Sequence, residues 1–226
     1  MQQRFFVTGT DTEIGKTTIA CGLLYAARQA GLSTAAAKPV AAGCEDTPDG
    51  LRNEDALALQ AQCQPPMAYE LINPIRLKSA IAPHIAAVEE SVPLTVELLA
   101  GGCLQVFDRE ADLTLVEGAG GWRVPLNADQ TLADLAKDLN IPVIMVVGMK
   151  LGCINHALLS AEAIAADGLT LAGWVANQVD PHMSRPSENL ATLRQQLKAP
   201  CLGFVPWMEQ PSAAAIAAYL DLAPLI

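Results

Sequence analysis

Residues 4–18 have the sequence RFFVTGTDTEIGKTT, and they carry the strongest local signal in the chain. The apolar residues 5–7 predict a buried strand bounded by Gly9. A loop of small and polar residues follows, and a helical pattern of apolar residues begins after Gly15, Lys16 and Thr17. A strand, a glycine-containing loop and a helix that opens at Gly-Lys-Thr together predict a phosphate-binding loop.

The N-terminus of that helix explains why such a loop would bind phosphate. First-turn N–H groups have no partners inside the helix, and the helix dipole favours negative charge there. Lys16 would reach the terminal phosphates of a nucleotide, and the Thr17 hydroxyl would ligate Mg²⁺. The spacing between the two glycines is one residue longer than in the common motif, and the loop carries Asp11 and Glu13. We therefore expect a nucleotide site built on a lengthened loop.

Composition and charge argue against several other kinds of protein. The chain has 226 residues, a net charge of −10 and no cluster of Lys or Arg, which disfavours a nucleic-acid or anionic-membrane surface. No apolar run is long enough to span a membrane, and the first strand begins too early to leave room for a signal peptide. The six cysteines are widely spaced without a CxxC pair, which is typical of reduced thiols. We therefore expect a cytoplasmic protein with one domain, residues 1–226.

Strand and helix patterns alternate along the chain. Residues 64–84 are rich in proline, and we expect an irregular segment there that packs over the functional face. The alternation, with short connections, predicts a three-layer α/β fold of the P-loop NTPase type, in which helices cover both faces of a mainly parallel sheet. Ligands of such sheets bind beyond the carboxyl ends of the strands. The expected strands are residues 5–7, 33–40, 112–117, 141–148, 171–179 and 201–205, and the expected helices are 16–30, 94–107, 132–139, 155–166 and 213–222, with shorter ones starting near 52 and spanning about 190–197.

Several charged or amide side chains fall at or just past the ends of these strands. Glu117 ends an apolar strand and precedes a run of glycines, which permit close approach of a ligand, and an acid at that place is where such proteins hold Mg²⁺. Lys38, between an alanine and a proline, is placed to bind an anion. Asp55 lies in a helix's first turn, where favourable charge against the helix dipole is a sufficient explanation from pattern alone. The strand-end set is Lys16, Lys38, Glu117, Lys150 and Asn177.

Residues 150–156, KLGCINH, form a second predicted strand-to-helix turn with a glycine. Its helix N-terminus would offer a second anion site. One phosphate site and a further anion site together suggest a substrate that carries its own carboxylate or phosphate. An ordinary connection between a strand and a helix accounts for the same pattern, so the residues alone leave both interpretations open.

Several of these motifs occur together in one known family. The longer phosphate loop at residues 8–17, the sequence VEGAGGW at 116–122 and the sequence KLGCINHA at 150–157 are a specific combination. With them the chain resembles the dethiobiotin synthetase family nearly end to end. Further matching segments are Lys38-Pro39-Val40, residues 50–55, Asn73-Pro74, residues 172–177 and Pro206-Trp207.

The resemblance implies an ATP-dependent ligase of biotin biosynthesis. In that reaction the diamine 7,8-diaminononanoate takes up CO₂ as a carbamate, and ATP phosphorylates the carbamate. The second amine then attacks the mixed anhydride and closes the cyclic urea of dethiobiotin, with release of ADP and phosphate. The resemblance also implies Mg²⁺ as the cofactor and a homodimer whose substrate site lies at the subunit interface.

Roles for the charged residues follow from the same resemblance. Thr17, Asp55 and Glu117 would hold Mg²⁺. Lys16 and Lys38 would neutralise charge that develops on the transferred phosphoryl group and on the carbamate oxygens. The catalytic set would be Lys38, Lys16, Thr12 and Glu13, of which the last two line the junction between the diamine and the γ-phosphate.

The resemblance also assigns the two binding sites. The substrate carboxylate, bound to one subunit, would be gripped by backbone amides at Gly152, Cys153, Ile154 and Asn155 of the other, while Thr12 and Lys38 contact the diamine. The adenine would bind at the far end of the nucleotide site. The ATP-binding set would be Glu13, Ile14, Gly15, Lys16, Thr17, Thr18, Asp55, Glu117, Gly118, Ala119, Gly120, Asn177, Gln178, Pro206, Trp207 and Met208.

Two positions depart from the family pattern. Ala42 stands where relatives often carry a hydroxyl residue that touches the substrate, so we expect weaker diamine binding with activity retained. Gln178 stands where an aspartate is expected, and the segment after Trp207 is short, so the far wall of the adenine site differs from the pattern.

A nucleotide-switch ATPase of the partition or division-site type is the alternative, because such proteins share this fold. They usually carry an extra lysine early in the phosphate loop, where this chain has Thr10, Asp11 and Thr12. They also need a basic surface or tail, whereas residues 213–226 contain no Lys or Arg. The synthetase is therefore the favoured interpretation.

Overall fold

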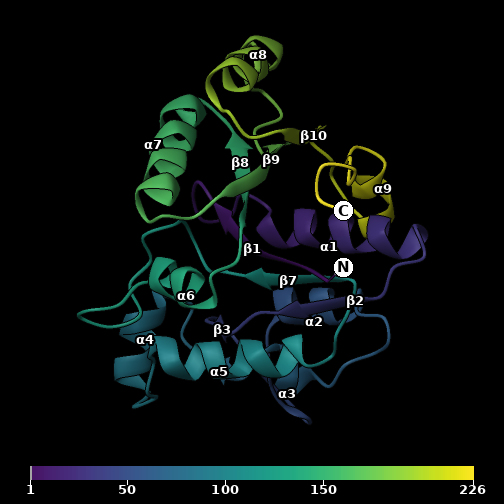
Figure 1. The fold of residues 1–226 in the computed structure, drawn as a ribbon. Coiled ribbons are helices and arrows are strands. Elements are labelled where there is room, and N and C mark those ends of the chain that lie inside the picture. The colour runs from purple at the N-terminus through teal and green to yellow at the C-terminus, as the bar shows by residue number, and fades with distance from the viewer. Residues whose placement is uncertain (1) are drawn as a thin grey trace.

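β1 (Gln3–Gly9) lies inside a six-stranded sheet in which every strand is parallel to its neighbours. The computed structural model describes residues 2–226. The strand order is β10-β9-β8-β1-β7-β2, so the strand before the phosphate loop is flanked by β8 and β7 (Figure 1). The predicted parallel sheet is confirmed. Its other strands are β2 (Thr34–Ala37), β7 (Leu113–Glu117), β8 (Val143–Met149), β9 (Leu171–Gln178) and β10 (Cys201–Val205).

Helices cover both faces of this sheet (Figure 1). α1 and α9 pack together on one face, whereas α5 packs with α6 on the other, against β2 and β7. α7 packs on β8 and β9 and also contacts α8. This is the three-layer arrangement that the alternating pattern predicts. The helices are α1 (Lys16–Gln29), α2 (Glu54–Gln60), α3 (Tyr69–Ile72), α4 (Pro83–Glu89), α5 (Val96–Phe107), α6 (Leu132–Leu139), α7 (Cys153–Ala166), α8 (Pro186–Gln196) and α9 (Ala213–Ala217).

The second predicted strand is two strands in the structure. The expected strand at 33–40 ends at Ala37, and β3 (Val40–Ala41) pairs instead with β6 (Ile75–Arg76) in a separate two-stranded sheet. Pro39 lies between the two strands and has no N–H group for a ladder, which explains the break. The break places Lys38 at the carboxyl end of β2, where side chains face the ligand edge of the sheet.

The chain that follows is more regular than the sequence predicts. A hairpin of β4 (Glu45–Thr47) and β5 (Gly50–Arg52) precedes α2. The prediction of irregular structure at 64–84 is confirmed for most of this segment, which also holds α3, β6 and the start of α4. These elements are only two to seven residues long, too short to show a periodic pattern.

The last helix is shorter than predicted. It ends at Ala217, whereas the apolar pattern continues to 222. The chain turns back after the helix, so that Leu220 forms a bridge with Gly203 and the N–H of Asp221 donates to the Leu202 carbonyl at 2.7 Å. This segment thereby covers part of the otherwise unpaired edge of β10.

The core of the sheet is aliphatic. All residues of β7 and β8 are buried, because helices cover both faces of a parallel sheet. Ile14 of the phosphate loop is buried too, and it packs so closely on Gly148 of β8 that a Cβ atom there would overlap the isoleucine side chain. The loop is therefore anchored on β8 as well as on β1.

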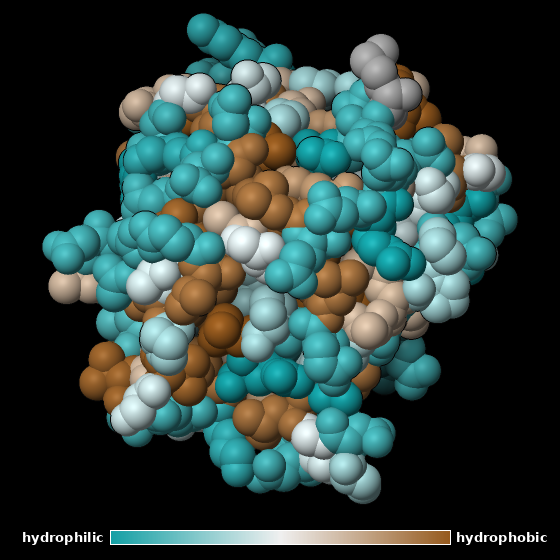
Figure 2. Space-filling model, turned by 60° about the horizontal axis from the view of Figure 1, so that its bottom comes forward, coloured by the Kyte–Doolittle hydropathy of each residue, from teal (hydrophilic) through white to brown (hydrophobic). Residues whose placement is uncertain are grey.

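The face that carries α3, α4 and α5 shows hydrophobic side chains in several patches separated by hydrophilic ones (Figure 2). The more exposed apolar residues of these helices are Ile85 and Val88 of α4 and Leu98 and Leu104 of α5. Scattered exposure of this kind is ordinary for a folded protein. Within residues 2–226, no helix is both long enough and apolar enough to cross a membrane.

Candidate active site

The phosphate loop is held open at the start of α1. Glu13 and Gly15 have positive φ angles of 57° and 78°, and no side chain caps the helix. A Cβ atom at Gly15 would collide with the side-chain amide of Asn177, so glycine supplies both the left-handed conformation and the space. The Asn177 amide donates to the Ile14 carbonyl at 2.8 Å, which ties the loop to the end of β9. The first-turn N–H groups of α1 are thus left to face an anion.

Lys16 folds back over this loop. Its side chain is buried, and Nζ donates to the carbonyl oxygen of Asp11 at 3.2 Å. Burial lowers the pKa of Lys16, an effect that the nearby Glu117 carboxylate opposes. A buried ammonium group beside an uncapped helix N-terminus favours a strongly anionic ligand, because the ligand's charge would replace lost hydration.

A second lysine forms the centre of a charged cluster. Lys38 Nζ donates to Glu117 Oε1 at 2.6 Å and to Asp55 Oδ2 at 2.9 Å, and the Thr17 hydroxyl donates to the same Glu117 oxygen at 2.7 Å. The ends of β2 and β7 and the first turns of α1 and α2 therefore meet here. Asp55, which pattern alone explains by the helix dipole, is brought into direct contact with the strand-end residue Lys38, which also contacts Glu117.

The charges of this cluster stabilise one another. Burial alone would lower the pKa of Lys38, but the Glu117 and Asp55 carboxylates overcome it and hold that pKa above its usual value. Burial would likewise raise the pKa of Asp55, and the Lys38 charge reverses the effect. Glu117 is 1% exposed, and its Oε2 atom is buried without a hydrogen-bond partner. A buried unpaired carboxylate oxygen is costly unless a ligand or ion completes it.

The donors of this cluster fit a magnesium ion. Glu117, Asp55 and Thr17 offer oxygen ligands only, which Mg²⁺ prefers, and Glu117 Oε2 has a free lone pair. Within residues 2–226, no group of three or more His, Cys, Asp or Glu side chains could form a metal site by itself. Two carboxylates and a hydroxyl suit a Mg²⁺ ion that keeps waters and takes its other ligands from nucleotide phosphates.

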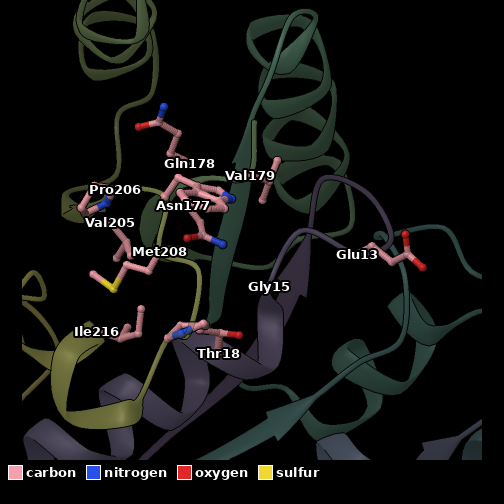
Figure 3. Close-up of a pocket in the computed structure, with 12 residues that line it drawn as sticks. Glu13, Gly15, Thr18, Asn177, Gln178, Val179, Val205, Pro206, Met208 and Ile216 are labelled. Carbon is pink, nitrogen blue, oxygen red and sulfur yellow. The ribbon is translucent and has the colours of Figure 1, made fainter. Parts of the chain in front are cut away.

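A cavity of about 230 Å³ opens beside the phosphate loop. Figure 3 shows Asn177 and Gln178 at the end of β9 and Met208 and Pro206 after β10 around this cavity, with Thr18 and Ile216 below them. The lining therefore mixes amide side chains with apolar ones, a combination that suits a planar heterocycle. The lining residues are Glu13, Gly15, Thr18, Asn177, Gln178, Val179, Val205, Pro206, Trp207, Met208, Pro211 and Ile216.

The second predicted anion site lies at the start of α7. Gly152 has a φ of 94°, and α7 begins without a side-chain cap. The neighbouring Leu151 is 95% exposed, so this helix N-terminus faces outward. Lys150 Nζ donates to Asp11 Oδ2 at 2.7 Å, which connects this turn to the phosphate loop and holds the pKa of Asp11 below its usual value.

Known proteins resemble the chain over nearly all of its length. Residues 3–215 match the family model described as an AAA domain. The chain is 66% identical over 221 residues to the ATP-dependent dethiobiotin synthetase BioD of Pseudomonas aeruginosa (strain UCBPP-PA14), which covers 98% of this chain and 97% of that protein. It is 60% identical to the protein of the same name from Cellvibrio japonicus (strain Ueda107), and this match covers 100% of this chain and 98% of that protein. The chain belongs to the dethiobiotin synthetase family.

Solved structures place this member of the dethiobiotin synthetase family among P-loop proteins. A ParA family ATPase from Chlorobium tepidum TLS matches with a TM-score of 0.56 at 11% identity and covers 99% of this chain and 94% of that one. FtsY from Thermotoga maritima matches with a TM-score of 0.56 at 14% identity. The match covers 96% of this chain and 68% of the FtsY chain. Likeness at this identity confirms the predicted fold alone. It gives no support to the partition-type alternative, since the curated relatives are synthetases.

The structure gathers most of the predicted dethiobiotin synthetase residues at one edge of the sheet. Lys16, Thr17, Lys38, Asp55 and Glu117 lie together, and the predicted adenine residues line one cavity. The glycine run after Glu117 lies beside the loop, because a Cβ at Gly120 would come within 3.4 Å of the Thr12 hydroxyl. The predicted carboxylate-binding amides, Gly152, Cys153, Ile154 and Asn155, belong to a separate, outward-facing turn.

Several contributors to this site were not predicted from the sequence. The Asp11–Lys150 pair joins two loops that are 139 residues apart in the chain. Trp122, beside the glycine run, packs edge-on against Phe6 and donates to Asp167, the residue that follows α7, at 2.7 Å. Trp122 appears in the matching motif VEGAGGW, which was the available signal. The apolar cavity residue Ile216 depends on the packing of α9 against α1, which sequence pattern does not give.

Proposed function

We propose that this chain is an ATP-dependent dethiobiotin synthetase that carboxylates 7,8-diaminononanoate and closes its cyclic urea. The observation that carries the proposal is the contact of Lys38 with both Asp55 and Glu117 beside the phosphate loop. In this proposal Lys38 would be a second buried ammonium group, besides Lys16, that faces the terminal phosphate. The transfer of a phosphoryl group to a carbamate needs positive charge near the phosphoryl oxygens and near the carbamate oxygens.

The nucleotide would bind along the phosphate loop. The N–H groups of Gly15, Lys16 and Thr17 would hold the phosphates, and the adenine would enter the cavity between Asn177 and Met208. Thr17, Asp55 and Glu117 would hold a magnesium ion, which would offset the negative charge of the nucleotide phosphates. With ATP bound, the Lys38 ammonium, held beside Asp55 and Glu117, would face the reacting oxygens.

The reaction then proceeds in three steps. One amine of the diamine adds to CO₂ and loses a proton, which gives a carbamate. A carbamate oxygen attacks the γ-phosphorus, the bond to the β-phosphate oxygen breaks, and ADP leaves with the electron pair. The second amine attacks the carbonyl carbon and loses a proton, the bond from that carbon to the phosphate oxygen breaks, and phosphate departs as the cyclic urea forms. Lys16 and Lys38 stabilise the charge on the oxygens, and Thr12 and Glu13 orient the amine ends at the loop.

The substrate carboxylate would bind at the start of α7 of a second subunit. The N–H groups of residues 152–155 lack a side-chain cap, and this turn faces outward from its own chain. A substrate with amines at one end and a carboxylate at the other could therefore bridge two copies. We infer a homodimer in which each site takes its phosphate loop from one subunit and its carboxylate site from the other.

The test is ADP release by the purified protein with MgATP, in the presence and absence of the diamine and bicarbonate. The proposal predicts ADP formation only when both are present, and entry of labelled bicarbonate into an acid-stable product in equal amount. A carbamate alone would lose its label in acid, so the stable label reports ring closure. ATP turnover that ignores the diamine but responds to lipid or a partner protein would contradict the proposal.

A further inference from the structure

A buried path of hydrogen bonds leads from the backbone of Lys38 to the start of α2. The side-chain amide of Asn73 donates to the Lys38 carbonyl oxygen at 2.7 Å and accepts from the Tyr69 hydroxyl at 3.1 Å. The Tyr69 oxygen in turn accepts from the N–H of Asn53 at 2.7 Å. The Asn53 side chain caps α2 and accepts from the N–H of Ala56 at 3.2 Å. The path therefore ends at the helical turn that carries Asp55.

The members of this path are enclosed by protein. Asn73 is 0% exposed, Tyr69 is 4% exposed and Asn53 is 7% exposed. A polar group buried this deeply depends on its protein partner, because water cannot replace a lost hydrogen bond. The path thus connects the backbone of Lys38 with the first turn of α2, which carries Asp55; the charged atoms of Lys38 and Asp55 are 2.9 Å apart.

We propose that Tyr69 and Asn73 are positioning residues, which hold the Lys38 ammonium and the Asp55 carboxylate at the separation that phosphoryl transfer requires. This inference rests on the proposed function, in which both groups act on the nucleotide. Stabilisation of developing charge depends on donors that are already in place, so a small shift of Lys38 relative to Asp55 lowers the rate. It also gives a role to Asn73-Pro74, a motif that the reaction itself leaves unexplained.

The ring of Tyr69 is held independently of its hydroxyl. The Arg52 guanidinium lies over the ring at 4.3 Å from its centroid and pairs with Glu70 at 3.0 Å. The variant Tyr69→Phe therefore keeps the packing and removes only the oxygen that joins Asn53 to Asn73. This makes it a specific probe of the path.

Thr34→Val is the matched control. Thr34 lies on β2, the strand that leads to Lys38, is 1% exposed, and donates its hydroxyl to the Gln62 carbonyl at 2.6 Å. Both variants lose one buried hydroxyl near β2, but only Tyr69→Phe interrupts the path. We expect Tyr69→Phe to lower kcat about tenfold with KM for ATP and diamine within about twofold, and Thr34→Val to keep kcat within about twofold. Equal kcat values for the two variants at comparable loss of Tm would overturn the inference.

Two further measurements separate positioning from general destabilisation. Asn73→Asp keeps the acceptor for Tyr69 but loses the donor to the carbonyl oxygens of Lys38 and Ile75, so it should lower kcat at least as much as Tyr69→Phe. In a Lys38→Leu background, adding Tyr69→Phe should change kcat by less than about twofold, because the positioned group is gone. An undiminished tenfold effect in that background would contradict action through Lys38.

A binding readout keeps the inference distinct from the proposed function. The affinity of the ADP-bound protein for Mn²⁺, measured by electron paramagnetic resonance, should fall several-fold in Tyr69→Phe and stay near wild type in Thr34→Val. A wild-type protein that forms no product in the synthetase assay overturns the proposed function and the inference with it. An active wild type with unaltered kcat and Mn²⁺ affinity in Tyr69→Phe overturns the inference alone.

Discussion

The helices α1 and α7 begin in the same way but in opposite surroundings. Each starts at a glycine with a positive φ, 78° at Gly15 and 94° at Gly152, and neither has a side-chain cap. The start of α1 is enclosed, so that a Cβ at Gly15 would collide with Asn177, whereas nothing lies within 4 Å of a Cβ at Gly152. The same local geometry therefore gives an enclosed binding site at the start of α1 and a solvent-facing helix N-terminus at α7.

The difference shows what a helix N-terminus needs in order to become a reaction site. At α1, buried Lys16 and Lys38 and the carboxylate of Glu117 supply charge and exclude water. At α7, only the backbone and the half-exposed Asp11–Lys150 pair are present, and Leu151 is 95% exposed. We infer that α1 performs the chemistry and that α7 holds the remote end of a substrate, with its missing walls supplied by a second copy.

The largest expected effect is at the enclosed site. Lys38→Leu should lower kcat by about 10²–10³-fold with much smaller changes in KM, because its charge matters most in the transition state. A pure KM effect would refute this role. Lys150→Leu, which removes the lysine at the other turn, should change kcat only a few-fold, since partly exposed ion pairs contribute little.

A stability measurement must accompany Lys38→Leu. The variant leaves buried Glu117 without its cation, which can cost about 3–5 kcal/mol of unfolding free energy. Lys38→Leu combined with Glu117→Gln should recover part of that stability but none of the activity. Recovery of both would mean that the lysine matters only for folding.

The open site should respond to charge alone. Asp and Asn both tolerate a left-handed backbone, so Gly152→Asp and Gly152→Asn differ essentially in one negative charge. Gly152→Asp should raise the diamine KM about tenfold relative to Gly152→Asn, because it repels the substrate carboxylate, with the ATP KM unchanged. Equal diamine KM values for the two variants would contradict the proposal that the start of α7 binds the substrate carboxylate.

The N-terminus of a third helix, α6, is capped by side chains, unlike those of α1 and α7. Thr131 and Asp134 form a capping box there, and the hydrogen bonds of Lys137 and Thr131 hold the pKa of Asp134, which burial alone would raise, at about 2 instead of 3.8. A lowered folded-state pKa stabilises the protein above the unfolded value and loses this effect as the pH falls towards 2. Asp134→Asn should therefore reduce the unfolding free energy at neutral pH by less than about 1 kcal/mol, given solvent screening.

Urea titrations of wild type and Asp134→Asn check this sign. The difference in unfolding free energy should be constant from about pH 7 to pH 5 and shrink below about pH 4. If the difference in unfolding free energy grew as the pH falls, it would contradict the claim that the ionised Asp134 carboxylate stabilises the start of α6.

The smallest effect concerns the diamine end of the α1 site. Ala42 stands where the family often carries a hydroxyl, and its carbonyl already accepts from the Asn53 side chain at 3.3 Å. Ala42→Ser should lower the diamine KM about two- to threefold by adding one hydrogen bond, with kcat unchanged. An unchanged or higher KM would show that water or backbone already fills that role.

The sequence predicts those parts of this site that depend on local pattern. The strand pattern places Glu117 at the ligand edge of the sheet, and Lys38 lies there because β2 ends at Ala37, before the end of the predicted strand. The helix α6 has the predicted bounds, Leu132–Leu139. The parallel sheet followed from the alternation of strands with helices. These features need only the 2- and 3.6-residue periods of the chain.

The remaining parts depend on contacts between distant segments. The Asp11–Lys150 pair spans 139 residues, and the Lys38–Asp55 pair requires the register of α2 against β2. The path through Tyr69 and Asn73 runs over a four-residue helix, where no periodic pattern exists. Sequence pattern cannot fix such contacts, because tertiary packing determines which of several compatible placements occurs.

The division of labour between α1 and α7 is tested most directly by mixing two defective subunits. Lys38→Leu and Gly152→Asp chains with different affinity tags would be co-expressed, and dimers with both tags assayed at low diamine concentration. A site shared between subunits leaves one of two sites intact in each mixed dimer, so about half of wild-type activity should return. Activity no higher than the average of the two parent variants would contradict the account.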